Sequence, residues 1–280
     1  MKPAAFRYER PRDVVGVLDL LAEHGDEAKI LAGGQSLVPM MNFRLARPEM
    51  IIDIGAVSGL DQVTRNGDHL AIGSRVRHIE LERPDFDGPL SSLLAVAARH
   101  VGHIPIRLRG TFGGSIAHAD PAAEWCLLAQ TLDAEVAVAS ARGKRAIAAA
   151  DLFKSAFITS IDDDELLTEV RLPWLGPDWK TGFSEFSRRA GDFAVVAVAT
   201  AIRLADGQVA EARIGAAGVG ATAVRLTQAE AALAGQLLGP DAIDAASEMA
   251  GEEVDPRGDI HGSADYRRDL VRALTRRALS

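Results

Sequence analysis

The spacing of hydrophobic positions predicts alternating strands and helices over the first 54 residues. Asp13 is the expected N-cap of an amphipathic helix that Gly25 ends. Short apolar runs at residues 29–32 and 50–54 predict two buried strands. The order strand, helix, strand, loop, strand is typical of a compact α/β unit.

The middle of the chain continues this alternation up to a proline-bounded linker. Apolar residues recur at strand or helix spacing, and one stretch of small residues between them is expected to be a loop. Prolines at 173 and 177 mark the clearest linker. The predicted elements are strands at 69–73, 135–139 and 166–172, helices at 91–101 and 121–132, and a loop at 110–120.

The last hundred residues have a different pattern. Residues 194–204 and 209–214 are expected to pair as a β-hairpin, because Asp206-Gly207 between them supplies the positive φ angles of a tight turn. A third strand is expected near residues 215–224. Two helices, at about 227–238 and 265–279, are expected to close the chain.

Composition narrows the class of protein. Hydrophobic residues at 48% and charged residues at 25% are ordinary for a globular chain and exclude disorder and fibrous structure. The net charge of −8 argues against a nucleic-acid partner. The single cysteine, Cys126, cannot form an internal disulfide and cannot alone hold zinc or an iron–sulfur cluster. The longest apolar stretch, 193–202, is too short for a membrane span, which needs about 20 residues, so we expect a cytoplasmic protein.

Two glycine-rich segments are the strongest candidates for chemistry. Paired glycines at 33–34 and 113–114 let successive N–H groups converge on an anion, and both pairs are followed by side-chain donors. Either pair alone is commonly a structural turn, and neither spacing matches a Walker A loop or G-x-G-x-x-G. Two such segments in one chain suggest a diphosphate held from both sides.

Other groupings of polar residues have simpler explanations. Ser115, His118 and Asp120 lie too close in sequence for a hydrolase triad. His100 and His103 lack a third ligand at metal spacing, so no metal site is predicted. The acidic run at 162–165 is expected to be a solvated turn.

Three ordered motifs, taken together, resemble a known family. They are Leu31-Ala32-Gly33-Gly34-Gln35-Ser36-Leu37-Val38-Pro39, the segment from Arg107 to Ala123 with Gly113-Gly114 at its centre, and Ser187-Arg188-Arg189-Ala190-Gly191-Asp192-Phe193-Ala194. Over nearly the whole chain, the sequence is similar to the FAD-binding medium subunits of molybdenum hydroxylases, such as aerobic carbon monoxide dehydrogenase and bacterial xanthine dehydrogenase-like enzymes.

The resemblance implies an α+β fold of the vanillyl-alcohol-oxidase-like type. It implies an FAD-binding domain at 1–175, with α/β subdomains at about 1–56 and 57–175, and a C-terminal domain at 176–280 with a three-stranded antiparallel sheet and helices. The residues that it assigns to the cofactor are Ala32, Gly33, Gly34, Gln35, Ser36, Thr111, Gly113, Gly114, Ser115, His118 and Glu124.

Several positions depart from the family pattern. Glu124 stands where the family usually has aspartate, and Ser115 and Phe112 stand where asparagine and isoleucine are common. Phe183 and Glu185 replace a frequent tyrosine and lysine.

The resemblance also implies a function and partners. The chain would be the flavoprotein subunit of a heterotrimeric oxidoreductase, with a molybdopterin-containing large subunit and a 2Fe–2S small subunit. FAD on this chain would receive electrons from the clusters and pass them to NAD, oxygen or a quinone-linked acceptor, and no residue of this chain would be catalytic toward the substrate. The alternative is a stand-alone FAD-dependent oxidoreductase of the same fold, which would need its own substrate pocket.

Overall fold

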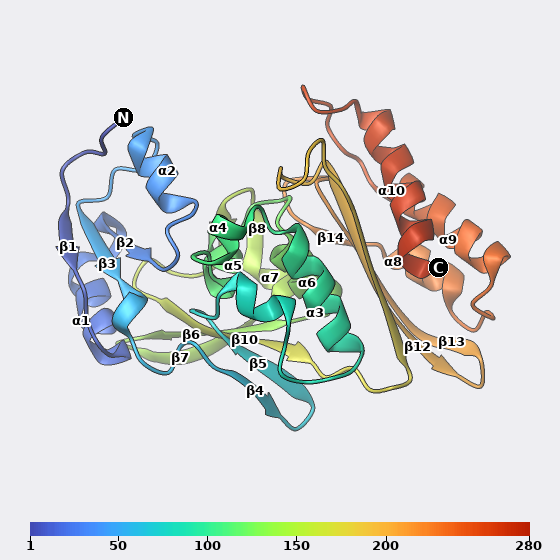
Figure 1. Cartoon of the computed structure of the whole chain (residues 1–280), viewed down its shortest axis with the longest axis horizontal. Helices are drawn as coiled ribbons and strands as arrows, with labels where there is room; N and C mark the ends of the chain where they lie inside the picture. Colours follow the sequence, from blue (N-terminus) through green and yellow to red (C-terminus); the bar gives the residue numbers. More distant parts are fainter.

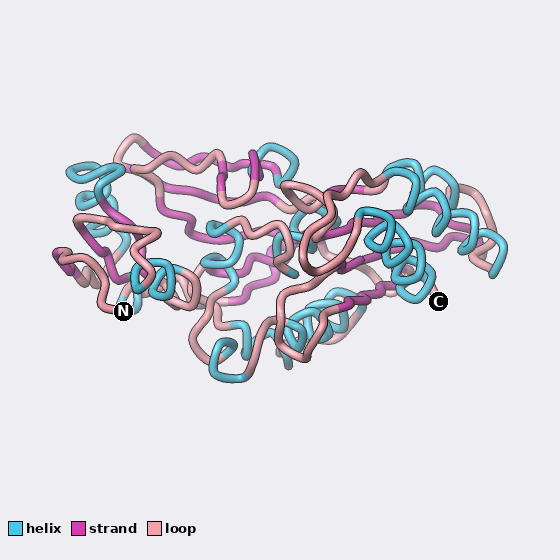
Figure 2. The backbone as a smooth tube through the Cα atoms, turned by 90° about the horizontal axis from the view of Figure 1, so that it is seen from above, coloured by secondary structure: helices cyan, strands magenta, loops and turns pink.

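The computed structural model describes all 280 residues, which form three parts that follow one another along the long axis of the molecule (Figure 1). Figure 2 shows the same arrangement from above, with the two termini toward opposite ends. Each part has its own sheet and its own cluster of buried hydrophobic residues.

The first part is a small α/β unit with a parallel sheet in the order β1-β3-β2. The side chain of Asp13 caps helix α1 by accepting from the N–H of Gly16 at 2.9 Å, and Gly25 ends the helix with a φ of 48°. Both predicted helix boundaries are therefore confirmed. The elements are β1 (Arg7–Glu9), α1 (Val14–His24), β2 (Ala28–Leu31), α2 (Leu37–Asn42) and β3 (Met50–Asp53).

The middle part is built on an antiparallel sheet of five strands in the order β4-β5-β10-β6-β7. Helix α6 lies almost entirely in the core, with Trp125 fully buried and in contact with Phe112 of α5 at 4.9 Å between ring centroids. The strands are β4 (Val63–Asn66), β5 (His69–Gly73), β6 (Glu135–Ser140), β7 (Gly143–Ala148), β8 (Phe153–Ser155), β9 (Ile158–Thr159) and β10 (Leu166–Pro173). The helices are η3 (His78–Glu82), α3 (Pro89–His100), α4 (Ile104–Arg107), α5 (Phe112–His118), α6 (Glu124–Thr131) and α7 (Ala149–Leu152).

The third part is an antiparallel sheet in the order β11-β12-β13-β14, with helices on both faces. Along β12, Val196 and Val198 face the C-terminal helices, whereas Ala197 and Ala199 belong to the core of the middle part. A strand buried on both faces explains the long apolar run in this stretch of sequence. The elements are β11 (Trp179–Phe186), β12 (Val196–Ala205), β13 (Gln208–Ala217), β14 (Val224–Arg225), α8 (Thr227–Leu233), α9 (Pro240–Glu253) and α10 (Ala264–Leu279).

The predicted hairpin is confirmed, but the predicted strand and helix counts of this part were too low. Asp206 and Gly207 have φ angles of 51° and 80° at the turn between β12 and β13. The sheet has four strands rather than three, because β11 precedes the hairpin and pairs with β12 along its whole length. Three helices rather than two follow the sheet, since α9 was not predicted: alanine rather than larger residues forms much of its buried face.

Candidate cofactor-binding site

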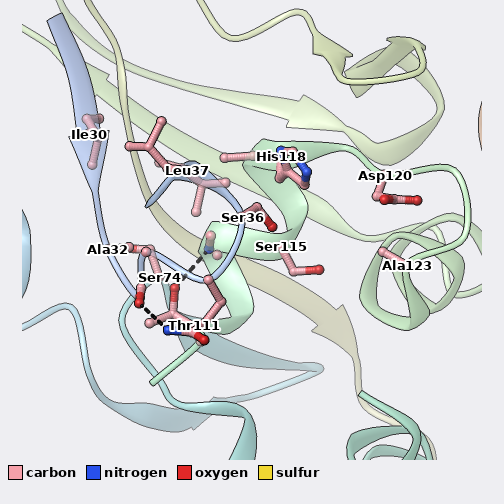
Figure 3. Close-up of a pocket in the computed structure, with 18 of the residues that line it drawn as sticks. Ile30, Ala32, Ser36, Leu37, Ser74, Thr111, Ser115, His118, Asp120 and Ala123 are labelled. Atoms are coloured by element: carbon pink, nitrogen blue, oxygen red, sulfur yellow. Dashed lines mark hydrogen bonds between the residues drawn. The ribbon is translucent and has the colours of Figure 1, made fainter. Parts of the chain in front are cut away.

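A cavity of about 630 Å³ lies where the first and middle parts meet. The β2–α2 loop forms one wall, α5 and the start of α6 form the opposite wall, and residues 191–193 of the third motif reach it from the C-terminal part. Its size is within the usual range for small-molecule and cofactor sites. Figure 3 shows Ala32 and Ser36 from the loop beside Thr111 and Ser115 from α5.

The first glycine segment, residues 33–36, presents unpaired backbone donors beside the cavity. None of the four N–H groups of this segment donates to another atom of the protein. Gly34 has a φ of 72°, a conformation that glycine adopts without strain. The side-chain amide of Gln35 donates to the carbonyl oxygen of Gly33 at 3.1 Å and so holds the loop in shape. Converging N–H groups of this kind bind anions.

The second glycine segment is a short helix rather than the predicted loop. Thr111 caps α5, because its hydroxyl oxygen accepts from the N–H of Gly114 at 3.1 Å, and Ala119 ends the helix in the left-handed region. Two adjacent glycines disfavour a helix on propensity alone. The N-cap and the burial of Phe112 and Ile116 in the core outweigh that preference.

Glycine also allows the segments around the cavity to approach one another closely. A Cβ at Gly33 would lie 2.6 Å from the Cα of Gly110, so the backbone of the first glycine segment is in direct contact with the residue that precedes the second. A Cβ at Gly113 would lie 2.5 Å from the Cβ of Ser74. The hydroxyl of Ser74 lines the cavity, is buried and has no hydrogen-bond partner in the protein.

All eleven residues that the sequence assigned to the cofactor line this one cavity, although they come from segments up to 92 positions apart. Sequence reasoning missed other lining residues, among them Ser74, His78, Asp162, Asp163 and Glu165. Only the third motif gave any signal for residues 191–193. No local pattern distinguishes Ser74 or His78.

The acidic run is in part the solvated turn that the sequence predicted, because Asp162 and Asp163 are exposed and residues 163–164 form a turn, but Glu165 is buried. Asp162, Asp163 and Glu165 line the cavity, and Glu165 is 6% exposed. The guanidinium of Arg145 donates to both carboxylate oxygens of Glu165 at 2.6 Å, and the N–H of Asp162 donates to one of them at 2.9 Å. This carboxylate is therefore a structural anchor of the cavity wall.

Burial controls the protonation of three groups at the cavity. Burial, and then the charges of Glu185 and Asp120, raises the pKa of Glu124 to about 8. Burial lowers the pKa of His78 to about 3, and its Nδ1 accepts from the indole N–H of Trp125 at 2.9 Å. Burial also lowers the pKa of His118, whose ring lies 5.0 Å from that of Phe157. At neutral pH these three groups are uncharged, whereas Arg10, Arg77 and Arg109 line a second hollow together with Gly33, Gly34 and Gln35 and supply positive charge beside the first glycine segment.

The residues present fit a dinucleotide such as FAD. The unpaired N–H groups of residues 33–36 match the phosphate oxygens of a diphosphate, and the hydroxyl of Ser74, which has no hydrogen-bond partner in the protein, could bond to a polar group of the cofactor.

No helix of the chain is long and apolar enough to cross a membrane.

Comparison with known proteins agrees with this fit. The family model described as the FAD binding domain in molybdopterin dehydrogenase matches residues 4–175, and the model described as the CO dehydrogenase flavoprotein C-terminal domain matches residues 181–280. The nicotine 6-hydroxylase medium subunit of Paenarthrobacter nicotinovorans is 40% identical over 279 residues, which covers 100% of this chain and 98% of that protein.

Solved structures are similar over the same length. A chain of carbon monoxide dehydrogenase from Hydrogenophaga pseudoflava superposes with a TM-score of 0.95 at 34% identity, covering 100% of this chain and 97% of the other. A chain of quinoline 2-oxidoreductase from Pseudomonas putida 86 gives 0.93 at 36% identity, with the same coverage. The predicted family, α+β fold class and FAD cofactor are thereby confirmed, and this chain belongs to the FAD-binding medium subunits of molybdenum hydroxylase complexes.

Proposed function

We propose that this chain relays electrons within a complex that also contains a molybdopterin-carrying large subunit and a 2Fe–2S small subunit. FAD, when bound, accepts electrons from the clusters and passes them to NAD, oxygen or a quinone-linked acceptor, which amino-acid side chains do not do. The observation that carries the proposal is the convergence of all three motifs on one cavity with unpaired N–H donors.

The eleven lining residues named above are proposed as the cofactor contacts. Residues 33–36 would hold the diphosphate through their unpaired N–H groups, and the adjoining residues 111–115, in which the N–H groups of 112–115 are paired within the protein, would line the same cavity, with Thr111 fixing the first turn of α5. Glu124 and His118, both lining the cavity, would contact the cofactor as neutral groups. The residues of this chain therefore bind and orient FAD, and substrate oxidation takes place on another subunit.

We propose domains at 1–175 and 176–280, with subdomains at about 1–56 and 57–175. The gap between the two family matches at residues 175 and 181 supports this division, as does the hydrophobic cluster that lies entirely within residues 196–279. The relatives also support a division of labour. Their names cite nicotine, quinoline and carbon monoxide, yet the subunit of each that matches this chain has nearly the same length, and the two solved ones have the same fold.

The test is anaerobic addition of the substrate to the purified complex before and after FAD is removed. We expect FAD removal to abolish turnover with the physiological acceptor, while the iron–sulfur clusters still bleach, because those centres lie upstream. If the isolated chain, loaded with FAD, is reduced directly by a small organic substrate, the relay function is wrong and a stand-alone oxidoreductase takes its place.

A further inference from the structure

The second hollow, of about 480 Å³, adjoins the cofactor cavity. Residues 32–35 line both spaces and so form the wall between them. Thr111 and Ser115 line only the cavity, whereas Arg77 and Arg109 line only the hollow. A ligand in the hollow would therefore leave the cavity free for FAD.

The hollow lies at one edge of the parallel sheet of the first part. Arg10 directly follows β1, residues 32–34 follow β2, and Asp53 and Gly55 lie at the end of β3. The carboxyl ends of all three strands meet at this edge because the strands are parallel. Small molecules that bind open α/β sheets bind outside the carboxyl ends of the strands. The hollow thus occupies the position at which such a sheet accepts a ligand.

The only carboxylate that lines the hollow already has partners. Asp53 accepts from the hydroxyl of Tyr8 and, at 2.7 Å, from the N–H of Gly55. Nε of Arg10 lies 3.6 Å from the same carboxylate, and this is the only ion pair among the lining residues. Asp53 therefore neutralises one of the three guanidinium groups of the hollow and leaves two without a counter-charge.

Those two groups belong to Arg77 and Arg109, which the backbone holds next to each other. The guanidinium of Arg77 donates to the carbonyl oxygen of Arg109, and the backbone of Arg77 pairs with that of Thr111. Neither side chain has a carboxylate within 4.0 Å. Burial, and then the positive charges of Arg75 and Arg109, lowers the pKa of Arg77, as expected where like charges gather without an anion. Arg77 is thus fixed in place, and the exposed side chain of Arg109 can close on a ligand.

The two unpaired charges favour a phosphate group over a carboxylate group. A phosphate monoester carries about 1.5 to 2 negative charges near pH 7, and a guanidinium group binds two of its oxygens at once. Apolar side chains line the same hollow and can pack against an organic group that carries the phosphate; they belong to Leu31, Val38 and Pro39. The volume of about 480 Å³ is within the usual range for small-molecule sites.

We propose that this hollow is a second ligand site, separate from the FAD cavity, which binds the phosphate group of a small molecule. Arg77 and Arg109 bind the phosphate oxygens, and Arg10 lies at the rim beside Asp53. The site does not depend on the proposed electron relay, because none of these side chains lines the cofactor cavity.

The first test is isothermal titration of the FAD-loaded complex with ADP, inorganic phosphate and adenosine at constant ionic strength. We expect ADP and phosphate to bind while the flavin absorbance stays with the protein, and adenosine not to bind. Tighter binding of ADP than of phosphate would support the site and identify a nucleotide-like ligand, whereas equal binding would support it and identify free phosphate. Absence of binding by both anions, or binding of adenosine as tight as that of ADP, would overturn the proposal.

The second test assigns the binding to the hollow. Arg109→Gln should weaken phosphate and ADP binding roughly ten- to a hundredfold, the loss expected for one hydrogen bond to a charged group. Arg109→Lys should recover part of the affinity, because it keeps the charge but not the bidentate geometry. The fold should tolerate both changes, since the side chain of Arg109 is exposed and has no carboxylate partner.

The matched control is Arg99→Gln, which removes an exposed arginine on α3 that lines neither the hollow nor the cavity. Its affinity for both anions should equal that of the wild type. An equal loss in Arg99→Gln and Arg109→Gln would mean an adventitious ion only, attracted by overall charge. That result, or unchanged affinity in Arg109→Gln, would exclude a phosphate site in the hollow.

Discussion

Gly33→Ala should weaken FAD binding by separating the two glycine segments. The added Cβ would lie 2.6 Å from the Cα of Gly110 and closer still to the carbonyl oxygen of Arg109. Both of these are backbone atoms, so no side chain can rotate away. To reach an ordinary contact distance of 3.4 Å, the segments would have to part by at least about 0.8 Å.

The size of the effect follows from this displacement. A hydrogen bond of about 2.9 Å lengthened by this amount exceeds the 3.5 Å limit and is lost. Hydrogen bonds to charged groups contribute roughly 1.5–3 kcal/mol each. Loss of one such bond to the diphosphate should therefore raise the dissociation constant of FAD about 10- to 100-fold, since each 1.4 kcal/mol is about tenfold.

The assay is reconstitution of FAD-depleted complex, followed by flavin fluorescence, with circular dichroism as a check on folding. Gly220→Ala is the matched control, because a Cβ there meets only the carbonyl oxygen of Thr222, at 3.7 Å. Wild-type affinity in a folded Gly33→Ala variant would refute the argument that close approach of the two segments shapes the site.

Three further predictions concern the same cavity. Gly34→Val and Gly114→Val should each lower FAD occupancy, measured as the flavin-to-protein ratio of the folded complex. Gly34 has a φ of 72°, which valine adopts only with strain, and a Cβ at Gly114 would lie 2.7 Å from the hydroxyl of Thr111 that caps α5. Full occupancy in either variant would mean that its segment is only a structural turn. The unfolding free energy of the FAD-free chain should fall between pH 4.5 and about pH 8, because the unfolded carboxyl of Glu124 loses its proton while the folded one keeps it. The unfolding free energy lost by pH 7 is roughly 3 kcal/mol, at about 1.4 kcal/mol per pKa unit. Urea titrations of Glu124→Gln should lack this pH-dependent loss, and identical pH profiles for the wild type and Glu124→Gln would contradict the prediction. Acid should release the flavin from the polypeptide, because the two glycine segments, 33–36 and 111–115, contain no histidine or cysteine that could attach it covalently. Flavin that remains on the denatured chain would refute this.

Local sequence determined the features that depend on neighbouring residues. Helix α1 begins after Asp13 and ends at Gly25, as predicted. Asp206 and Gly207 form the turn of the hairpin, and residues 69–73 form β5 at the predicted positions. Caps, tight turns and strand periodicity need only a few adjacent residues. The ordered motifs also sufficed to identify the family and, through it, the cofactor.

Features that depend on packing appeared only in the tertiary structure. The Gly113-Gly114 segment is helical because the core holds Phe112 and Ile116, and β11 was missed because its burial does not alternate cleanly. The raised pKa of Glu124 on α6 depends on its burial and on the charge of Glu185 on β11, 61 residues later in the chain. Burial and charge at such a site are set by segments brought together on folding, so no local pattern of residues specifies them.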